Sequence, residues 1–129
     1  MLFRSPVRIH TLSLIQDSAG PGRFRGGCGM RKDIEMLTDG ATVVLLGDRH
    51  RTAPWGLFGG GEGTRARTVL IRGGQEADLS SKEVARLQRG DIVSFRLAGA
   101  GGYGAPMLRD LAALKEDLKD GFQIGRAHV

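Results

Sequence analysis

Cysteine is almost absent from this 129-residue chain, which contains only Cys28. A single cysteine cannot form an internal disulfide, so a reducing cytoplasm is the default compartment. Long hydrophobic runs are also missing, because the longest clean apolar run, residues 43–46, is far shorter than the roughly twenty residues that cross a bilayer. No charged segment followed by an apolar one opens the chain, as a secretion signal would. We therefore expect a cytoplasmic location without membrane insertion.

Residues that mark nucleotide, metal or nucleic-acid sites are sparse. No glycine is followed by lysine, so the phosphate-binding loop of many ATPases is absent. His10, His50 and His128 lack partners at metal-ligand spacing. Aromatic residues make up only 5% of the chain. Basic residues outnumber acidic ones and leave a net charge of +5, but they never form a run. We expect this segment to bind no cofactor, metal or nucleic acid. A small basic β-barrel that binds nucleic acid remains the alternative, and it would show salt-dependent binding to DNA.

Glycine is abundant instead, with 21 residues and no repeating period. Residues 17–29 form a loop with five glycines, which we expect to adopt positive φ and to direct backbone N–H groups at a common centre. Residues 48–61 form a second long irregular stretch. A third, residues 99–104, matches the dinucleotide fingerprint G-x-G-x-x-G. The chain lacks the further strand ending in an acid that a dinucleotide site needs, so a tight turn is the better interpretation.

Alternation of apolar and polar residues predicts several strands. They are residues 7–14, 30–37, 42–46, 68–72 and 92–97. Residues 39–40 are expected to join the second and third strands as a hairpin turn, and residues 80–87 to form a helical turn or loop. Apolar residues at helical spacing predict an amphipathic helix from Pro106 to about Gly121. The predicted fold is mainly β, an antiparallel barrel or sandwich with Gly-rich loops and one C-terminal amphipathic helix.

Two polar pairs lie within the irregular stretches. Asp17 and Ser18 can hydrogen-bond the amides of their own loop, as Asx and Ser turns do, or contact a substrate. Ser18 is not in a nucleophile elbow and has no identified base, so it is not assigned as a nucleophile. Asp48 and Arg49 form either an ion pair that braces the second stretch or groups that face a ligand.

Several of these segments, taken in order, resemble a known family. The blocks are residues 17–27, Asp48–Arg49, residues 54–60, residues 101–104, Arg109–Asp110 and Asp120–Gly121. Their order and spacing resemble the C-terminal end of the hydantoinase B family, which includes N-methylhydantoinase, 5-oxoprolinase and acetone carboxylase alpha subunits. The resemblance covers about residues 7–122. The chain departs from the usual residues of the family at Ala19, Cys28 and Ala100. Ala19 would be strained by about 1 kcal/mol or more if its position requires positive φ.

The resemblance implies a division of labour within a larger enzyme. Residues 1–123 would be the C-terminal β-rich segment of a longer hydantoinase B-like subunit, a fragment that is inactive alone. The subunit would act in ATP-dependent hydrolysis of a cyclic amide of the N-methylhydantoin or 5-oxoproline type, or in ketone carboxylation. ATP would bind a hydantoinase A-like partner subunit or domain, and any divalent metal would lie in the upstream part of the same subunit.

We expect the Gly-rich loops and the Trp55 loop to shape or close the active site. The candidate residues are Asp17, Ser18, Gly20, Gly22, Arg25, Gly26, Gly27, Asp48, Arg49, Trp55, Gly56, Gly101, Gly102, Tyr103 and Gly104. Arg25 and Arg49 would direct their guanidinium groups to this surface and, with loop amides, stabilise an anionic intermediate. No catalytic residue is assigned. Residues 17–29, the pair Asp48–Arg49 and residues 101–104 should therefore converge in space.

The last six residues stand apart from this pattern. Residues 124–129, Ile-Gly-Arg-Ala-His-Val, are what the codons ATC GGA AGA GCA CAC GTC would encode, a string that resembles a common sequencing adapter. The family resemblance also stops before them. We expect a non-native tail whose removal leaves the stability unchanged. A genuine tail is the alternative.

Overall fold

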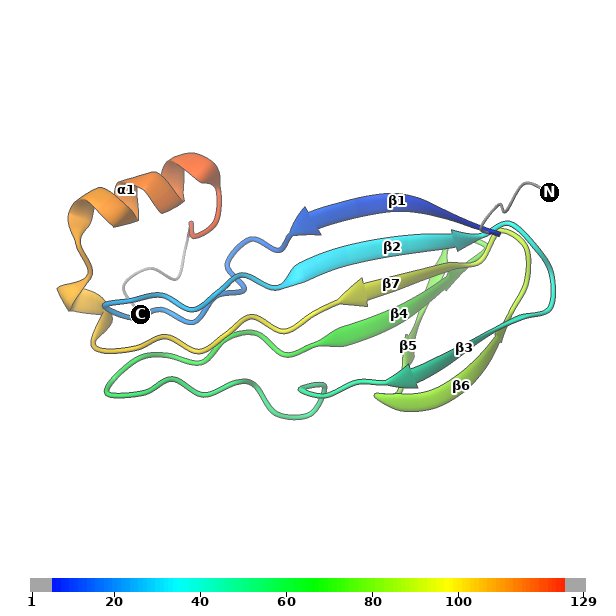
Figure 1. Ribbon diagram of the computed structural model, residues 1–129, viewed down its shortest axis with the longest axis horizontal. Coiled ribbons are helices and arrows are strands. Elements are labelled where there is room, and N and C mark those ends of the chain that lie inside the picture. Colours follow the sequence, from blue (N-terminus) through cyan, green and yellow to red (C-terminus); the bar gives the residue numbers. More distant parts are fainter. Residues whose placement is uncertain (1–5, 125–129) are drawn as a thin grey trace, which may run out of the picture.

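The computed structural model describes residues 6–124. Figure 1 shows an elongated molecule with strands at one end, long irregular segments at the other, and a helix beside those segments. The elements are β1 (Val7–Leu14), β2 (Met30–Met36), β3 (Ala41–Leu46), β4 (Arg67–Arg72), β5 (Gln75–Leu79), β6 (Lys82–Leu87), β7 (Ile92–Arg96), the 3-10 helix η1 (Pro106–Leu108) and α1 (Leu111–Asp120). No helix in the described part is long and apolar enough to cross a membrane. The predicted non-native tail lies outside the described residues, apart from Ile124.

Two antiparallel sheets form the strand-rich end. The first has five strands in the order β1-β2-β7-β4-β5, and β3 pairs with β6 in the second. Met36, Leu87 and Val93 are buried at the centre of the core. Half-buried apolar residues pack around them, namely Val7, Ile34, Ala41, Val43, Leu70 and Phe95. The predicted mainly β fold with one C-terminal helix is confirmed. The arrangement is sandwich-like, and the described strands do not close into a barrel.

Two local predictions are wrong. Gly40 does turn the chain, with φ +74, but β2 and β3 belong to different sheets and β3 pairs with β6 instead. Residues 82–87 form strand β6 rather than a helical turn, because pairing with β3 overrides the helix preference of the lysine, glutamate, alanine and arginine residues in that segment. Strand β5 is not among the strands predicted from the sequence. It forms a hairpin with β4 through Gly73 and Gly74, both at positive φ.

The five-stranded sheet has a polar and an apolar face, because successive side chains of a strand alternate between faces. On the polar face the carboxylate of Asp33 accepts hydrogen bonds from Arg31 at 2.9 Å and from the Ser94 hydroxyl at 2.6 Å. Burial alone would raise the pKa of Asp33, but the hydrogen bonds from Arg31 and Ser94 lower it further than burial raises it. The opposite face carries the apolar side chains that pack against β3 and β6.

Candidate functional site

Three irregular Gly-rich segments lie side by side beyond the strands (Figure 1). They are residues 17–29, 54–64 and 98–104, and we call them the glycine bundle. The Gly20 amide donates a hydrogen bond to the carbonyl oxygen of Ala100 at 2.7 Å. The Gly61 amide donates to Pro21 at 2.7 Å, and the Gly102 amide donates to Gly61 at 2.9 Å. The expected convergence of the first and third segments is confirmed.

Glycine is required in the bundle because neighbouring backbones touch. A Cβ atom on Gly26 would overlap the carbonyl oxygen of Ala100, and one on Gly101 would overlap the carbonyl oxygen of Trp55. The same close approach to backbone atoms holds at Gly20, Gly22, Gly29, Gly56, Gly60, Gly63, Gly99 and Gly102. Gly27 differs, because a Cβ there would meet nothing within 4 Å. Side chains are thus excluded from most of the bundle by the chain's own backbone.

The positive φ angles expected in residues 17–29 are not found at the glycines. None of the five has φ in the left-handed region, so this prediction is wrong. Their amides do not point at a common centre either: the Gly26 amide donates to the carbonyl oxygen of Gly20 at 3.0 Å, and the Gly29 amide donates to Ser18. Ala19 is fully buried and also lacks a positive φ, so the strain considered for it does not arise.

Ser18 and Asp17 bind other parts of this chain. The buried Ser18 hydroxyl donates to the carbonyl oxygen of Ile15 at 2.6 Å and accepts from the Gly29 amide at 2.7 Å. Ser18 therefore closes its own loop, as the turn-making alternative predicted. Asp17 has φ +56, and its Oδ1 accepts from the Ile124 amide at 2.6 Å. The Asp17 carboxylate thus holds the segment that follows α1.

Arg25 points at α1. Its Nε donates to Asp117 Oδ2 at 2.9 Å, and its Nη1 donates to the carbonyl oxygen of Gly26 at 3.0 Å. Arg109 Nη2 donates to the same Asp117 oxygen at 2.6 Å. The Arg25 guanidinium also lies 5.5 Å from the centre of the Phe122 ring. The expectation that Arg25 faces an open surface is wrong, because these contacts use it to fasten α1 to the glycine bundle.

Arg49 stacks on Trp55. Its guanidinium carbon lies 5.0 Å from the centre of the indole ring, and Trp55 is 67% exposed. Arg49 has φ +64, a conformation that costs energy for a residue with a Cβ. Asp48 lies 4.0 Å from the Lys82 ammonium, so it pairs with Lys82 rather than with Arg49. Of these two residues, Arg49 contacts the bundle, through Trp55, whose carbonyl oxygen packs against Gly101.

Aromatic side chains gather at the end of the bundle. The Tyr103 ring lies 5.3 Å from the Phe58 ring and 6.2 Å from the Phe24 ring. Gly104, at φ +77, donates its amide to the carbonyl oxygen of Leu57 and so turns the chain beside them. Phe58 has φ +50 and is 78% exposed. Tyr103 is among the candidate residues predicted from the sequence and the two phenylalanines are not, although both lie inside the blocks that carry the family resemblance.

Comparison with known proteins supports the family resemblance noted in the sequence. The sequence model of the family described as hydantoinase B/oxoprolinase matches residues 3–106. This chain belongs to the hydantoinase B/oxoprolinase family. The matched residues include all seven strands and the glycine bundle, and the match ends before α1.

The chain spans about a fifth of the length of the first two relatives described below. It is 39% identical over 115 residues to an uncharacterised protein of Methanocaldococcus jannaschii, covering 89% of this chain and 20% of that protein. It is 34% identical over 127 residues to caprolactamase subunit beta of Pseudomonas jessenii, covering 90% and 21%. The crystal structure of the ATP-dependent caprolactamase from that organism matches with a TM-score of 0.79 and 31% identity, covering 92% and 21%. Nucleotide-free acetone carboxylase matches with a TM-score of 0.78 at 18% identity, covering 94% and 20%, which shows likeness of fold alone.

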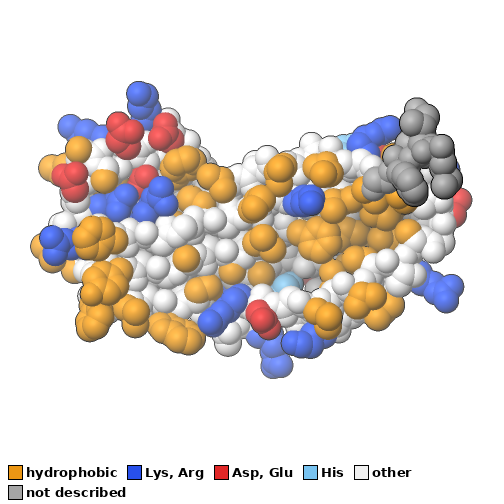
Figure 2. Space-filling model, in the orientation of Figure 1, with side chains coloured by type: hydrophobic (Ala, Val, Ile, Leu, Met, Phe, Trp, Pro, Cys, Tyr) orange, Lys and Arg blue, Asp and Glu red, His pale blue; other side chains and the backbone are white. Residues whose placement is uncertain are grey.

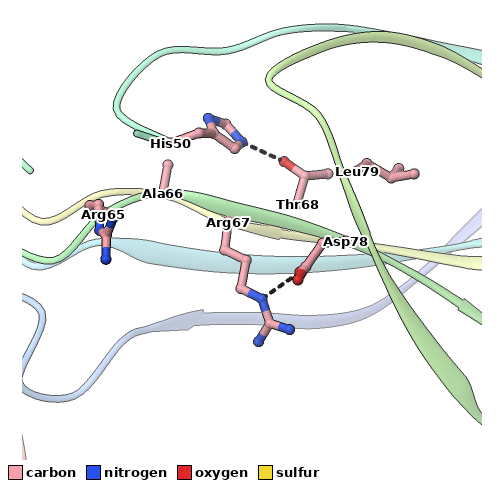
Figure 3. Close-up of a pocket in the computed structure, with 7 residues that line it drawn as sticks. All are labelled: His50, Arg65, Ala66, Arg67, Thr68, Asp78 and Leu79. Atoms are coloured by element: carbon pink, nitrogen blue, oxygen red, sulfur yellow. Dashed lines mark hydrogen bonds and ion pairs between the residues drawn. The ribbon is translucent and has the colours of Figure 1, made fainter. Parts of the chain in front are cut away.

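Figure 3 shows a cavity of this hydantoinase B/oxoprolinase chain whose lining contains none of the candidate residues predicted from the sequence. It has a volume of about 330 Å³. His50 Nε2 lies 3.1 Å from the Thr68 hydroxyl, and His50 Nδ1 lies 3.1 Å from the carbonyl oxygen of Asp48. Arg67 Nε donates to Asp78 Oδ1 at 2.6 Å. The cavity is thus bordered by an imidazole fixed against β4 and by an arginine already paired with a carboxylate.

Carboxylates in this family member pair mainly with arginines. Arginines with an Asp or Glu partner are Arg8, Arg25, Arg31, Arg67, Arg72, Arg96 and Arg109. Within residues 6–124 no three His, Cys, Asp or Glu side chains lie together as a metal site requires. The expectations that this segment itself binds no metal, cofactor or nucleic acid stay predictions.

Proposed function

We propose that this chain is the C-terminal segment of a longer hydantoinase B-like subunit that hydrolyses a cyclic amide in a reaction that consumes ATP. The observation that carries the proposal is the 34% identity to caprolactamase subunit beta over 90% of this chain. The caprolactamase structure is described as ATP-dependent, and its fold matches this one. Because the chain spans only about a fifth of caprolactamase subunit beta, the activity is proposed for the whole subunit, and the chain alone is expected to be inactive.

The proposal assigns ATP to a partner. A hydantoinase A-like subunit or domain would bind ATP, and any divalent metal would be held by the upstream part of the hydantoinase B-like subunit. The name of caprolactamase subunit beta supports an enzyme of more than one subunit. The substrate class is a small cyclic amide of the N-methylhydantoin or 5-oxoproline type. The single cysteine is consistent with the cytoplasmic location proposed for such an enzyme.

The glycine bundle would act as a rigid support for side chains at its surface. Opening an amide ring places negative charge on the former carbonyl oxygen, and a fixed guanidinium stabilises such charge. Arg49, held over the exposed Trp55 ring, is the arginine suited to this role. Arg25 is not, because Asp117 and the carbonyl oxygen of Gly26 already occupy its guanidinium. The remaining candidate residues would hold the loops in place.

Carboxylation of a ketone is the competing reaction. The observation in its favour is the likeness of fold to acetone carboxylase. The identity is higher to the lactam-opening enzyme, 31% against 18% over similar coverage. Hydrolysis is therefore the reaction that we propose, and the two are separated by whether the enzyme requires carbon dioxide or bicarbonate.

A chimera tests whether this chain can serve in a ring-opening enzyme. The matching segment of caprolactamase subunit beta of Pseudomonas jessenii would be replaced by this chain, and the chimera combined with the partner subunit of that enzyme. We expect hydrolysis of caprolactam that depends on ATP and does not depend on bicarbonate. The control is the same chimera carrying Gly26→Ala, in which a Cβ would overlap backbone and disturb the bundle.

Assembly has to be measured alongside activity. The proposal is contradicted if the chimera assembles with its partner, as shown by gel filtration, and yet opens no lactam in the presence of ATP. It is also contradicted if the longer subunit native to this chain carboxylates acetone and opens none of caprolactam, N-methylhydantoin and 5-oxoproline.

A further inference from the structure

One face of the five-stranded sheet carries an open hollow lined almost wholly by apolar side chains. We call it the apolar trough; it has a volume of about 440 Å³ and is lined by Leu12, Met30, Lys32, Ile34, Phe95 and Leu97. Leu12 is 63% exposed and Leu97 50%. Figure 2 shows hydrophobic side chains gathered on this face, over the region of β2 and β7. Contiguous exposed apolar surface of this kind marks a docking site more often than a solvent face.

The second sheet covers this face only in part. Along β2, Met36 is 9% exposed and belongs to the buried core, whereas Met30 at the other end of the strand is 39% exposed. Along β7, Val93 is 1% exposed, whereas Leu97, just beyond the strand, is half exposed. The core under β3 and β6 therefore continues into the trough without a cover among the described residues.

Strand β3 borders the trough with an unpaired edge. The two cavities that adjoin the trough are lined by residues of β3 together with Phe95. β3 pairs with β6 along one edge, and no described strand pairs with the other. Such an edge presents a row of N–H and C=O groups to a further strand. A strand added there would lie over the trough and place alternate side chains on its floor.

The opposite face of the sheet carries charged side chains that form ion pairs with one another. Arg31 pairs with Asp33 at 2.9 Å, and Arg8 pairs with Glu35 at 3.4 Å. Lys32 is the one charged residue among those lining the trough, and no described carboxylate forms an ion pair with it. The two faces thus differ in kind, and the trough is complementary to a surface that is mostly apolar with one negative charge.

We propose that the apolar trough is the docking site of a β-strand from the remaining part of the longer subunit, which pairs with the free edge of β3. The inference rests on the proposed function only in taking this chain as a segment of such a subunit. About four-fifths of the length of the Methanocaldococcus jannaschii protein and of caprolactamase subunit beta lies outside the segment that matches this chain, so a longer subunit of that kind contains the material to cover the trough. The strand carries apolar side chains at alternate positions and a carboxylate opposite Lys32.

Hydrogen exchange in the longer subunit and in the 129-residue chain tests the pairing without any substitution. The β3 amides that do not bond to β6 exchange freely in the short chain and are protected in the longer subunit. Equal exchange of these amides in the two proteins overturns the proposal. A short chain that dimerises through the trough, with β3 protected in the dimer, assigns the trough to a second copy and overturns it as well.

Two neighbouring residues of β1 provide matched variants, because they point to opposite faces of the sheet. In the longer subunit, Leu12→Asp puts a charge on the trough floor and is expected to raise exchange at the β3 edge by about tenfold or more. Ser13→Asp, on the polar face, leaves it unchanged. An equal effect of both, or none from Leu12→Asp, contradicts the proposal. Neither readout uses enzyme activity, so protection of β3 in a subunit that opens no ring overturns the proposed function and leaves the docking site standing.

Discussion

The amide of Gly20 donates a hydrogen bond to the carbonyl oxygen of Ala100 at 2.7 Å, joining two positions that are eighty residues apart in the chain. A Cβ atom on Gly20 would meet the backbone oxygen of Ala100 at 3.0 Å and other backbone atoms more closely still. The close approach of the two backbones therefore explains both the hydrogen bond and the need for glycine at position 20. The glycine bundle is a structure built from direct contact between backbones, and its surface is where exposed side chains such as Trp55 stand.

Adjacent glycines test this account of the bundle. Gly26→Ala should lower the free energy of unfolding by about 2 kcal/mol or more, because its Cβ would overlap the carbonyl oxygen of Ala100. Gly27→Ala should change it by less than about 0.5 kcal/mol, because nothing lies within 4 Å of its Cβ position. Urea unfolding of the two variants measures the difference. Equal effects would show that the bundle does not require backbone contact at Gly26.

Ser18 should contribute to stability through its two hydrogen bonds. Ser18→Ala removes the acceptor of the buried Gly29 amide and the donor to Ile15, at a cost of about 1–3 kcal/mol. Ser13→Ala, an exposed serine on β1, is the matched control and should be nearly neutral. Thermal unfolding of both variants checks the prediction. A Ser18→Ala variant as stable as the control would return Ser18 to the list of substrate contacts.

Asp91 should make the stability depend on acid pH. Hydrogen bonds from Arg72 Nε at 3.0 Å and Arg72 Nη2 at 2.6 Å lower the pKa of Asp91, with burial opposing and the Gln88 amide assisting. Because the pKa is lower in the folded than in the unfolded state, this stabilisation is present above the unfolded pKa of about 3.9 and is lost as pH falls through the folded value.

The corresponding variant is Asp91→Asn. It should be less stable at neutral pH by about 2 kcal/mol and should lose less stability on acidification below pH 4. Asp78→Asn, which breaks the exposed pair with Arg67, should have a much smaller effect at neutral pH. Denaturant unfolding between pH 2 and pH 7 gives both quantities. Parallel stability curves for Asp91→Asn and the unsubstituted protein would contradict the assignment.

The two arginines considered for the site should behave differently in the reconstituted longer enzyme. Arg49→Ala should lower turnover more than stability, because Arg49 contacts the exposed Trp55 and no described carboxylate. Arg25→Ala should lower stability and loosen α1, because it removes the hydrogen bond to Asp117. Steady-state kinetics and thermal unfolding of each variant separate the two effects. A loss of turnover with Arg25→Ala at unchanged stability would restore Arg25 to the active surface.

Five strands could be predicted from the sequence, because apolar and β-branched residues mark them; they are β1, β2, β3, β4 and β7. β1, β2 and β7 alternate apolar and polar residues because one face of their sheet packs on a core. β6 was mistaken for a helical turn, since its lysine, glutamate and alanine residues favour helix and only its pairing with β3 makes it a strand. Local sequence carries no information about which distant strand will pair.

The candidate site shows the same limit. Its Gly-rich segments were visible in the sequence, but the reason for the glycines lies in backbone atoms of other segments. The partner of Arg25 is Asp117, which is 92 residues away, so nothing near Arg25 could reveal that its guanidinium is occupied. Phe58 was missed because an exposed phenylalanine at φ +50 departs from both the hydrophobic pattern and the usual residue for such a turn.

The most direct test of the proposed function is the ATP dependence of ring opening by the longer subunit that contains this segment, combined with its ATP-binding partner. We predict that the ring-opened product of caprolactam, N-methylhydantoin or 5-oxoproline appears only when ATP is present, together with hydrolysis of ATP and without added bicarbonate. Ring opening at the same rate without ATP, or ATP hydrolysis coupled only to carboxylation of acetone, would contradict it.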